Sequence, residues 1–343
     1  SLEVLASRAL APSLGVSVFS WTGIIGVVLL GIIVGNILGG LLADRGGSRV
    51  LLGRSLAGAG VAVLVTIYVV AVMGPLFSTI SLYLPLKTFL FTLLAFFVPA
   101  CALATISPQL ARLAVGEGGK VGTTVASLST WNTLGGLAGT LMTAFFLISW
   151  IGTRGLLVAI AGLLVSLGWW LSGRVFFWRR RLTMVMIVCF GLAVFLPSTC
   201  LRETRYFCIQ LISDPSSTEA NPSYILRLDH LVHSYVHLRR PEALGYGYEQ
   251  VYAHLIAALK SPTDSFSSLF IGGGGYVLPR YLLSQYPQAQ SVVAEIDPAV
   301  TRVNYDQLGL PPTPFIETAS VDARLYVNYT SSSRPFDFVF GDA

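Results

Sequence analysis

The hydrophobic positions of this chain follow two different patterns, which meet near residue 200. Before that point, six long apolar runs carry no charged residue, and each is close to or above the ~18–20 residues that cross a bilayer as a helix. The runs cover about 16–43, 55–73, 88–107, 121–153, 155–173 and 182–199. The pattern therefore predicts a multi-pass bundle of membrane helices over residues 1–199.

After residue 200 the apolar runs become short, and polar turns separate them. Apolar and polar residues alternate from Glu203 to Val236, which is typical of strands, and a helix is expected from about Tyr246 to Leu259. We expect a small β domain with a connecting helix over 200–262, followed by a nucleoside-binding domain over 263–343.

A glycine-rich turn organises this last domain. An apolar run, Leu269 to Ile271, enters four glycines; a helix-like segment follows, and a second apolar run, Val292 to Ala294, ends on an acid. In nucleotide-binding α/β units such glycines let the backbone approach the ligand, and the acid meets a ribose hydroxyl. The pattern assigns this role to Gly272, Gly273, Gly274, Gly275 and Glu295. The alternative is a glycine cluster that serves only packing or a linker.

Composition and charge agree with a membrane half and a water-soluble half. Mean hydropathy is +0.70, and charged residues make up 11% of the chain, against about 25% in ordinary globular proteins. Residues 1–200 hold 12 Lys and Arg against 3 Asp and Glu, whereas residues 201–343 hold 10 against 14. The overall charge of +5 is therefore a signal of membrane topology. It indicates the lipid bilayer as a partner and no nucleic acid.

The positive residues alternate between the connections of the predicted helices. Nine of them follow the first, third and fifth segments: Arg45, Arg49, Arg54, Arg112, Lys120, Arg174, Arg179, Arg180 and Arg181. The other connections carry only Lys87 and Arg154. The first set is assigned to the cytoplasm, so the soluble half is predicted on the non-cytoplasmic side. This prediction reverses if one segment is re-entrant or if 121–173, split only by Arg154, is miscounted.

Small and polar residues inside the apolar runs indicate how the helices pack. Glycines repeat at short spacing in two runs, which predicts close approach of helix backbones. A proline is expected to kink the third helix, and an asparagine to form an interhelical hydrogen bond. These residues are Gly31, Gly35, Gly39, Gly135, Gly136, Gly139, Pro99 and Asn36.

The cysteines and histidines suggest little chemistry of their own. Cys101 and Cys189 stand in apolar runs and are expected to be packing residues. Cys200 and Cys208 flank the junction of the two halves and could pair, although free thiols are the preferred interpretation. The histidines all follow residue 200; His230 and His233 are expected on opposite faces of a strand, so no metal site is predicted.

Two parts of the chain resemble one known family. The opening, Glu3 to Pro12, and the turn from Gly39 to Arg45 look like the membrane half of bacterial fused major-facilitator/spermidine-synthase-like proteins. The segments 203–209 and 226–234 and the glycine turn look like their polyamine-synthase domain. The resemblance implies a small β domain followed by a Rossmann-like, methyltransferase-type doubly wound sheet, here ending after its fourth strand. It also implies one more helix before Ser1 and further strands after Ala343.

The resemblance further implies a co-substrate and site residues. Spermidine synthases move an aminopropyl group from decarboxylated S-adenosylmethionine to putrescine, so this compound or S-adenosylmethionine is the expected co-substrate. Asp322 matches the aspartate that meets the adenine amino group, and Asp342 the catalytic aspartate that accepts a proton from the attacking amine. The alternatives are that Asp322 caps the next helix and that Asp342 only begins a turn.

The positions that face the amine depart from the family. Gly275 stands where the family has an aspartate that holds the ammonium of the aminopropyl arm, and Phe207 replaces a glutamine. On the substrate side, His233 replaces a second glutamine, and Glu249 replaces the histidine after the family's helix tyrosine, here Tyr248. The nucleoside-facing set is therefore kept, while the amine-facing set is altered.

Three functions follow from these observations. The first is a membrane-anchored, spermidine-synthase-like transferase that moves an aminopropyl or other alkyl group to a small-molecule amine or another acceptor. The second is a catalytically inactive accessory or docking subunit with protein partners in a membrane complex. The third is a transporter, since Gly40 to Arg49 resembles a major-facilitator loop; however, ion-coupled carriers usually keep charged residues within the membrane, and these runs have none.

Overall fold

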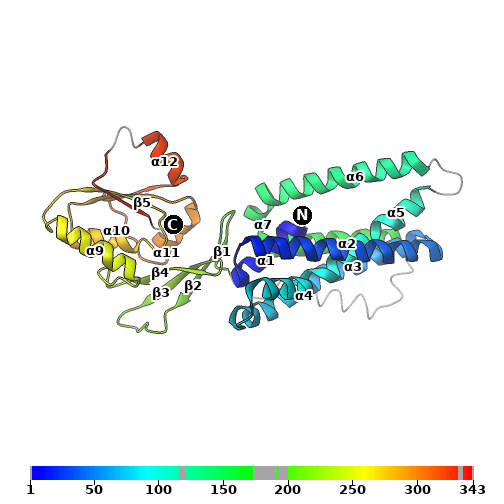
Figure 1. The fold of residues 1–343 in the computed structure, drawn as a ribbon, viewed down its shortest axis with the longest axis horizontal. Coiled ribbons are helices and arrows are strands. Elements are labelled where there is room, and N and C mark those ends of the chain that lie inside the picture. The colour runs from blue at the N-terminus through cyan, green and yellow to red at the C-terminus, as the bar shows by residue number, and fades with distance from the viewer. Residues whose placement is uncertain (1, 116–120, 173–190, 192–199, 331–334, 342–343) are drawn as a thin grey trace. The chain divides into compact units, whose positions relative to one another are not determined.

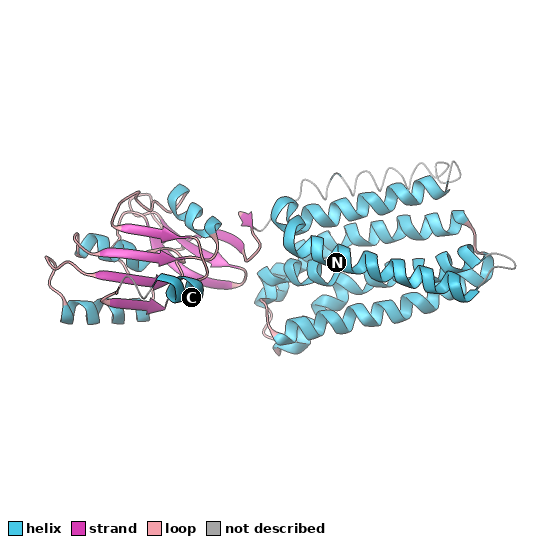
Figure 2. Ribbon diagram, turned by 90° about the horizontal axis from the view of Figure 1, so that it is seen from above, coloured by secondary structure: helices cyan, strands magenta, loops and turns pink. Residues whose placement is uncertain are grey.

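The computed structural model describes residues 2–115, 121–172, 191, 200–330 and 335–341. The chain divides into two compact units, Ser1–Thr199 and Cys200–Ala343. In the described residues the first unit is helical, and all strands belong to the second (Figure 2). This is the predicted fold class, a region of long apolar helices followed by an α/β part with a parallel sheet.

The first unit consists of helices of unequal length (Figure 1). They are α1 (Leu2–Leu14), α2 (Val18–Gly46), α3 (Arg49–Thr79), α4 (Leu84–Ala104), α5 (Ile106–Val115), α6 (Val121–Met142), the π-helical segment η1 (Thr143–Leu147) and α7 (Ile148–Ser172). Four helical runs in the described residues are long and apolar enough to cross a membrane: Val18–Gly46, Arg49–Thr79, Leu84–Val115 and Val121–Ser172.

The observed helices differ from the predicted segments in three places. The segments 121–153 and 155–173 fall on one helical run, which breaks at Gly152 with φ 76° instead of at Arg154. The segment 182–199 lies outside the described residues apart from Gly191. Helix α1 was not predicted; its 13 residues are too few to span a bilayer, and its apolar side is buried against other helices of the unit.

Glycines allow α2 to pack directly on α4, as predicted. A Cβ atom on Gly35 would collide with the carbonyl oxygen of Cys101, and one on Gly39 would lie 2.5 Å from the carbonyl oxygen of Thr105. The same prediction is not supported for Gly135 and Gly136, where a Cβ atom would meet no described residue within 4 Å. The reason is that no described residue of α6 is buried.

Two further expectations for the helical unit have different outcomes. Asn36 is exposed on α2 instead of being buried between helices, so the predicted interhelical role is not supported. Pro99 is buried inside α4, which ends at Ala104, and the kink expected at this residue stays a prediction. Cys101 lies partly buried in the same helix, and Cys189 lies outside the described residues.

The second unit contains two sheets of four strands each in the described residues. The first is antiparallel, with β1 (Arg202–Glu203), β2 (Cys208–Ser213), β3 (Ser223–Leu228) and β4 (Leu231–His237) in chain order, and α9 (Gly247–Leu259) follows it. The second is parallel, with the order β7-β6-β5-β8. Its elements are β5 (Ser267–Ile271), α10 (Val277–Gln285), β6 (Gln290–Ala294), α11 (Pro298–Asp306), β7 (Ile316–Ala319), α12 (Ala323–Thr330) and β8 (Phe338–Gly341).

The parallel sheet is doubly wound, and its topology locates a binding edge. The chain moves from β5 outward to β7 and then returns to place β8 on the other side of β5. Right-handed crossovers therefore place α10 and α11 on one face and α12 on the other, as Figure 1 shows. In such sheets ligands bind at the carboxyl ends of the strands where the winding direction reverses. That point is the end of β5, where the glycine turn begins.

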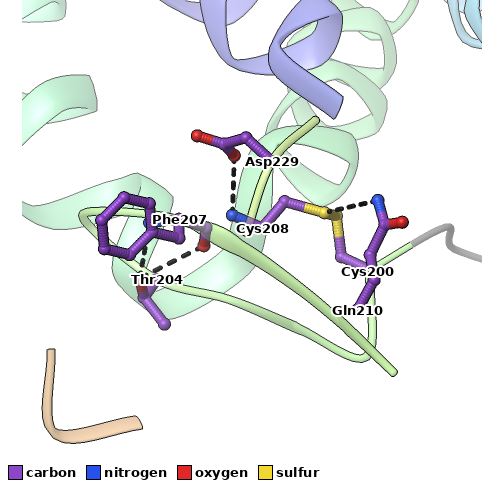
Figure 3. The surroundings of a disulfide bond; sticks show 6 residues. All are labelled: Cys200, Thr204, Phe207, Cys208, Gln210 and Asp229. Atoms are coloured by element: carbon purple, nitrogen blue, oxygen red, sulfur yellow. Dashed lines mark hydrogen bonds between the residues drawn. A yellow bond between two sulfur atoms is a disulfide. The ribbon is translucent and has the colours of Figure 1, made fainter. Parts of the chain in front are cut away.

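The cysteines at the start of the second unit form a disulfide, so the preference for free thiols was wrong (Figure 3). Strands β1 and β2 pair as an antiparallel hairpin in which Glu203 is opposite Cys208. Beside this hairpin, the Cα atoms of Cys200 and Cys208 lie 5.3 Å apart, within the range that a disulfide needs. The sequence could not show it, because the pairing depends on the register of a two-residue strand.

Candidate functional site

The glycine turn after β5 has a backbone that other residues would not readily adopt. Gly272 and Gly274 have φ angles of 92° and 45°, a region that disfavours side chains with a Cβ atom. A Cβ on Gly273 would lie 2.7 Å from the ring of Tyr276 and 3.2 Å from a carboxylate oxygen of Glu295. Three consecutive glycines are therefore required by the turn itself.

Glu295 follows β6 and lies directly beside the glycine turn. Its side chain is 5% exposed, and its two oxygens accept hydrogen bonds from different backbone groups. The Gly273 N–H donates to Oε2 and the Asp297 N–H to Oε1, both at 2.8 Å. Burial raises the pKa of this carboxyl, and these two donors partly oppose the rise. Each oxygen keeps lone pairs with which it can accept a hydroxyl.

Asp297 supports this arrangement, although the sequence analysis gave it no role. Its Oδ1 accepts the Ala299 N–H at 3.0 Å and so caps α11. Its Oδ2 accepts the hydroxyl of Thr204 at 2.5 Å. The signal in the sequence was Asp297 before Pro298, because aspartate at the N-cap and proline at the first helical position commonly begin a helix.

Helix α11 also holds the underside of the glycine turn. Tyr276, at φ 54°, is fully buried, and its hydroxyl is 2.8 Å from that of Thr301. Burial raises the pKa of this phenol. The Asn304 Nδ2 donates to the Gly274 carbonyl oxygen at 2.8 Å. Side chains thus hold the turn in one conformation without a ligand, and the Tyr276 ring fills the space beneath Gly273.

Gly275 packs against the antiparallel sheet instead of facing open space. Its N–H donates to the Ser234 Oγ at 2.7 Å. A Cβ on Gly275 would lie 2.6 Å from the Ser234 Cβ and 2.6 Å from the Val236 Cγ2. The aspartate that the resemblance expects here has no room, because β4 occupies its place.

The two other acids predicted for the site have different outcomes. Asp322 follows the carboxyl end of β7 and is partly buried, and its Oδ1 accepts the Arg324 N–H at 2.8 Å at the start of α12. This is the capping contact considered as the alternative, and it leaves Oδ2 for another partner. Asp342 lies outside the described residues, directly after β8, which ends at Gly341.

The residues predicted on the substrate side, Glu249, Tyr248 and His233, do not form a pocket with an exposed carboxylate. Glu249 is 2% exposed, and its Oε2 accepts the Tyr246 N–H at 2.9 Å, which caps α9. Tyr248, 38% exposed, stacks on Tyr246 with 5.5 Å between ring centroids. His233 lies on β4 beside Phe207, and burial lowers its pKa.

No metal site accompanies these residues in the described part of the chain, where no group of three or more His, Cys, Asp and Glu side chains could hold an ion. His230 precedes β4 in a turn, so the predicted alternation of two histidines along one strand does not apply.

The similarity of this chain to known proteins is slight. No protein-family model and no curated protein matches the chain. One solved structure that resembles it is a probable spermidine synthase from Corynebacterium glutamicum ATCC 13032, with 25% sequence identity, 43% of this chain and 53% of that chain covered, and a TM-score of 0.38. The chain thus spans about half the length of that protein. A likeness of this size identifies neither a family nor an activity, and no comparison supports the resemblance of the helical half to major facilitators.

Proposed function

We propose that the second unit binds the nucleoside part of an S-adenosyl compound, and that the protein is a membrane-anchored alkyl transferase. The observation that carries this proposal is the position of Glu295, a buried carboxylate beside a glycine turn at the winding switch of a doubly wound sheet. The residues present fit a nucleoside, because the turn is preformed and the carboxylate retains acceptor capacity for ribose hydroxyls. Asp322 Oδ2 is the proposed partner of the adenine amino group.

The reaction class follows from the sulfonium centre that such a donor supplies. A nucleophile attacks a carbon next to the sulfonium, the carbon–sulfur bond breaks, and a neutral thioether leaves. Asp342 is the proposed acceptor of the proton that the nucleophile loses. Positioning of the two reactants contributes most of the rate in a displacement of this kind.

The closed position at Gly275 argues against putrescine aminopropyl transfer. The ammonium of a decarboxylated donor has no carboxylate at this place, because Ser234 and Val236 fill it. A missing charge-assisted hydrogen bond costs about 1.5–3 kcal/mol. S-adenosylmethionine carries the same ammonium, but its own carboxylate is beside it and offsets the charge. We therefore propose S-adenosylmethionine as the preferred donor, with an acceptor other than a charged diamine.

The second candidate is a domain that keeps the fold without catalysis and docks a protein partner. It is favoured by Glu249, whose carboxylate caps α9, and by the packing of β4 against the turn. Both features use polar groups and space that a polyamine site would need.

The proposed location of the second unit is the non-cytoplasmic side of the membrane. Two features support it: the distribution of arginines between the connections and the Cys200–Cys208 disulfide. Disulfides persist in oxidising compartments and are rare in the cytosol.

A binding and turnover panel on the detergent-solubilised full chain tests the proposal. We expect S-adenosylmethionine and methylthioadenosine to bind, decarboxylated S-adenosylmethionine to bind more weakly than S-adenosylmethionine, and putrescine to yield no spermidine. Binding of none of the nucleosides would leave the docking function as the remaining candidate. Efficient spermidine formation would contradict the assignment of the altered amine pocket.

A further inference from the structure

The hairpin that begins the second unit reaches the nucleoside site through one side chain. The chain runs from Cys200 through β1, turns at Thr204–Phe207 and enters β2 at Cys208, the first residue of that strand (Figure 3). The turn is closed by the Thr204 N–H, which donates to the Phe207 carbonyl oxygen at 2.9 Å. The Thr204 Oγ1 accepts the Tyr206 and Phe207 N–H groups at 3.1 and 2.9 Å. This hydroxyl is therefore part of the turn that joins the two arms, and its position depends on both of them.

The single proton of the Thr204 hydroxyl is directed to the acid motif after β6. The carboxylate oxygen of Asp297 is 2.5 Å away, closer than the Phe207 carbonyl oxygen, which is also an acceptor, at 3.2 Å. Asp297 in turn donates its N–H to Glu295, and the Glu295 carboxylate accepts the Gly273 N–H. A continuous chain of hydrogen bonds thus runs from Thr204 to the glycine turn.

The two arms of this hairpin are held very differently. The β2 arm is anchored in the sheet, where Cys208 exchanges two hydrogen bonds with Asp229, both at 2.9 Å. The β1 arm has only two residues, and Arg202 is exposed. The Leu201 N–H donates to the Ile209 carbonyl oxygen at 2.8 Å, and the disulfide adds a covalent link between this short arm and β2. Cys200 is partly exposed, whereas Cys208 is 2% exposed, so a reductant reaches the sulfur of Cys200 first.

We infer that Thr204 is a positioning residue for the Glu295–Asp297 motif, and that the Cys200–Cys208 disulfide controls this positioning. One thiol of a dithiol attacks the sulfur of Cys200 and releases Cys208 as a thiol; the second thiol then attacks the mixed disulfide, closes the dithiol's own disulfide ring and releases Cys200 as a thiol. The protein disulfide takes up two electrons and two protons, and the dithiol is oxidised. Without the link the β1 arm frays, Thr204 leaves Asp297, and the motif at the nucleoside edge loosens. The effect on ligand affinity rests on the proposed function, whereas the effect on the motif does not.

Two variants and one reductant separate this role from a general structural one. Thr204→Val removes the hydroxyl at nearly constant volume, and Thr204→Ser keeps it. Dithiothreitol opens the disulfide in the wild-type full chain. Amide hydrogen exchange reports on the motif without a ligand, and calorimetry with methylthioadenosine reports on affinity. Helix α9 is the internal control, since it contributes no residue to this chain of hydrogen bonds.

We expect faster hydrogen exchange at the Gly273 and Asp297 amides after reduction and in Thr204→Val. Exchange in α9 should not change, and Thr204→Ser should exchange like the wild type. Methylthioadenosine affinity should fall about 3- to 10-fold in the same two cases, the equivalent of one ordinary hydrogen bond. Unchanged exchange at both amides would overturn the inference whatever the ligand does. Lack of methylthioadenosine binding by the oxidised wild type would instead overturn the proposed function.

Discussion

At the residue scale, direct contacts between the glycine turn and a few side chains fix the geometry of the site. Glu295 and the glycine turn were predicted together. The pattern that predicts them, a strand, a glycine run and an acid about 20 residues later, lies within one short stretch of sequence. Asp297 and Thr204 were not assigned roles, since they meet across 93 positions of sequence. The closure of Gly275 by β4 could not be predicted either, because it depends on how two sheets pack.

Restoring the aspartate of the polyamine synthases at position 275 should therefore damage the fold instead of improving it. Gly275→Asp forces Ser234 and Val236 apart, and overpacking of this kind costs about 1–3 kcal/mol. We expect a lower melting temperature and no gain in affinity for decarboxylated S-adenosylmethionine. Gly247→Asp is the matched control, because nothing lies within 4 Å of that position at the start of α9. A stable Gly275→Asp protein that binds the decarboxylated donor tightly would refute the explanation.

His233 gives a prediction for pH. Burial lowers its pKa in the folded protein below the usual value, so the unfolded chain binds the proton more readily. Stability is therefore complete above the ordinary histidine pKa of about 6.5 and decreases as the pH falls below it. We expect His233→Gln to lose less stability than the wild type between neutral and mildly acidic pH in thermal unfolding. His254→Gln, at an exposed position of α9, should behave like the wild type; equal acid sensitivity in all three proteins would count against this assignment.

At the element scale, length and apolarity predicted most helices, but not where each one ends. The break between the fourth and fifth segments is at Gly152, because glycine can adopt the positive φ of a reversal, whereas charge had suggested Arg154. Helix α1 was missed because it is short and carries Glu3 and Arg8. Glycine spacing predicted packing correctly for α2, whereas no described residue lies within 4 Å of a Cβ atom on Gly135 or Gly136 of α6. Spacing alone does not show which face of a helix has a neighbour.

The packing of α2 on α4 predicts different outcomes for two glycines of the same helix. Gly35→Ala places a methyl group against the Cys101 carbonyl oxygen, and we expect it to destabilise the helical unit by about 1–3 kcal/mol. Gly40→Ala meets nothing within 4 Å and should be neutral or slightly stabilising, since alanine favours helix. Melting in detergent compares the two. Equal effects would show that α2 and α4 do not approach as described.

At the scale of the whole molecule, the chain combines an apolar helical unit with an α/β unit that has a disulfide. The division near residue 200 was visible in the sequence because hydropathy and charge both change there. The side of the membrane on which the second unit lies depends on the number of crossings. It therefore stays a prediction from the arginines and the disulfide.

Two reporters fused in turn after Ala343 test that prediction. Because the second unit is expected outside the cytoplasm, alkaline phosphatase should be active there and green fluorescent protein should be dark. Thiol labelling of the same cells should find Cys200 and Cys208 oxidised. A bright fluorescent fusion with an inactive phosphatase would place the unit in the cytoplasm and contradict the helix count.

The central claim is that Glu295 and the glycine turn hold an adenosine-type ligand, and calorimetry with methylthioadenosine tests it most directly. Glu295→Gln keeps the size of the side chain and removes its charge, and its melting temperature serves as a control for folding. We predict one binding site in the wild type and an affinity at least about 10-fold lower in Glu295→Gln, the loss expected for a hydrogen bond to a charged group. No binding by the wild type, or equal binding by a folded Glu295→Gln protein, would contradict the account.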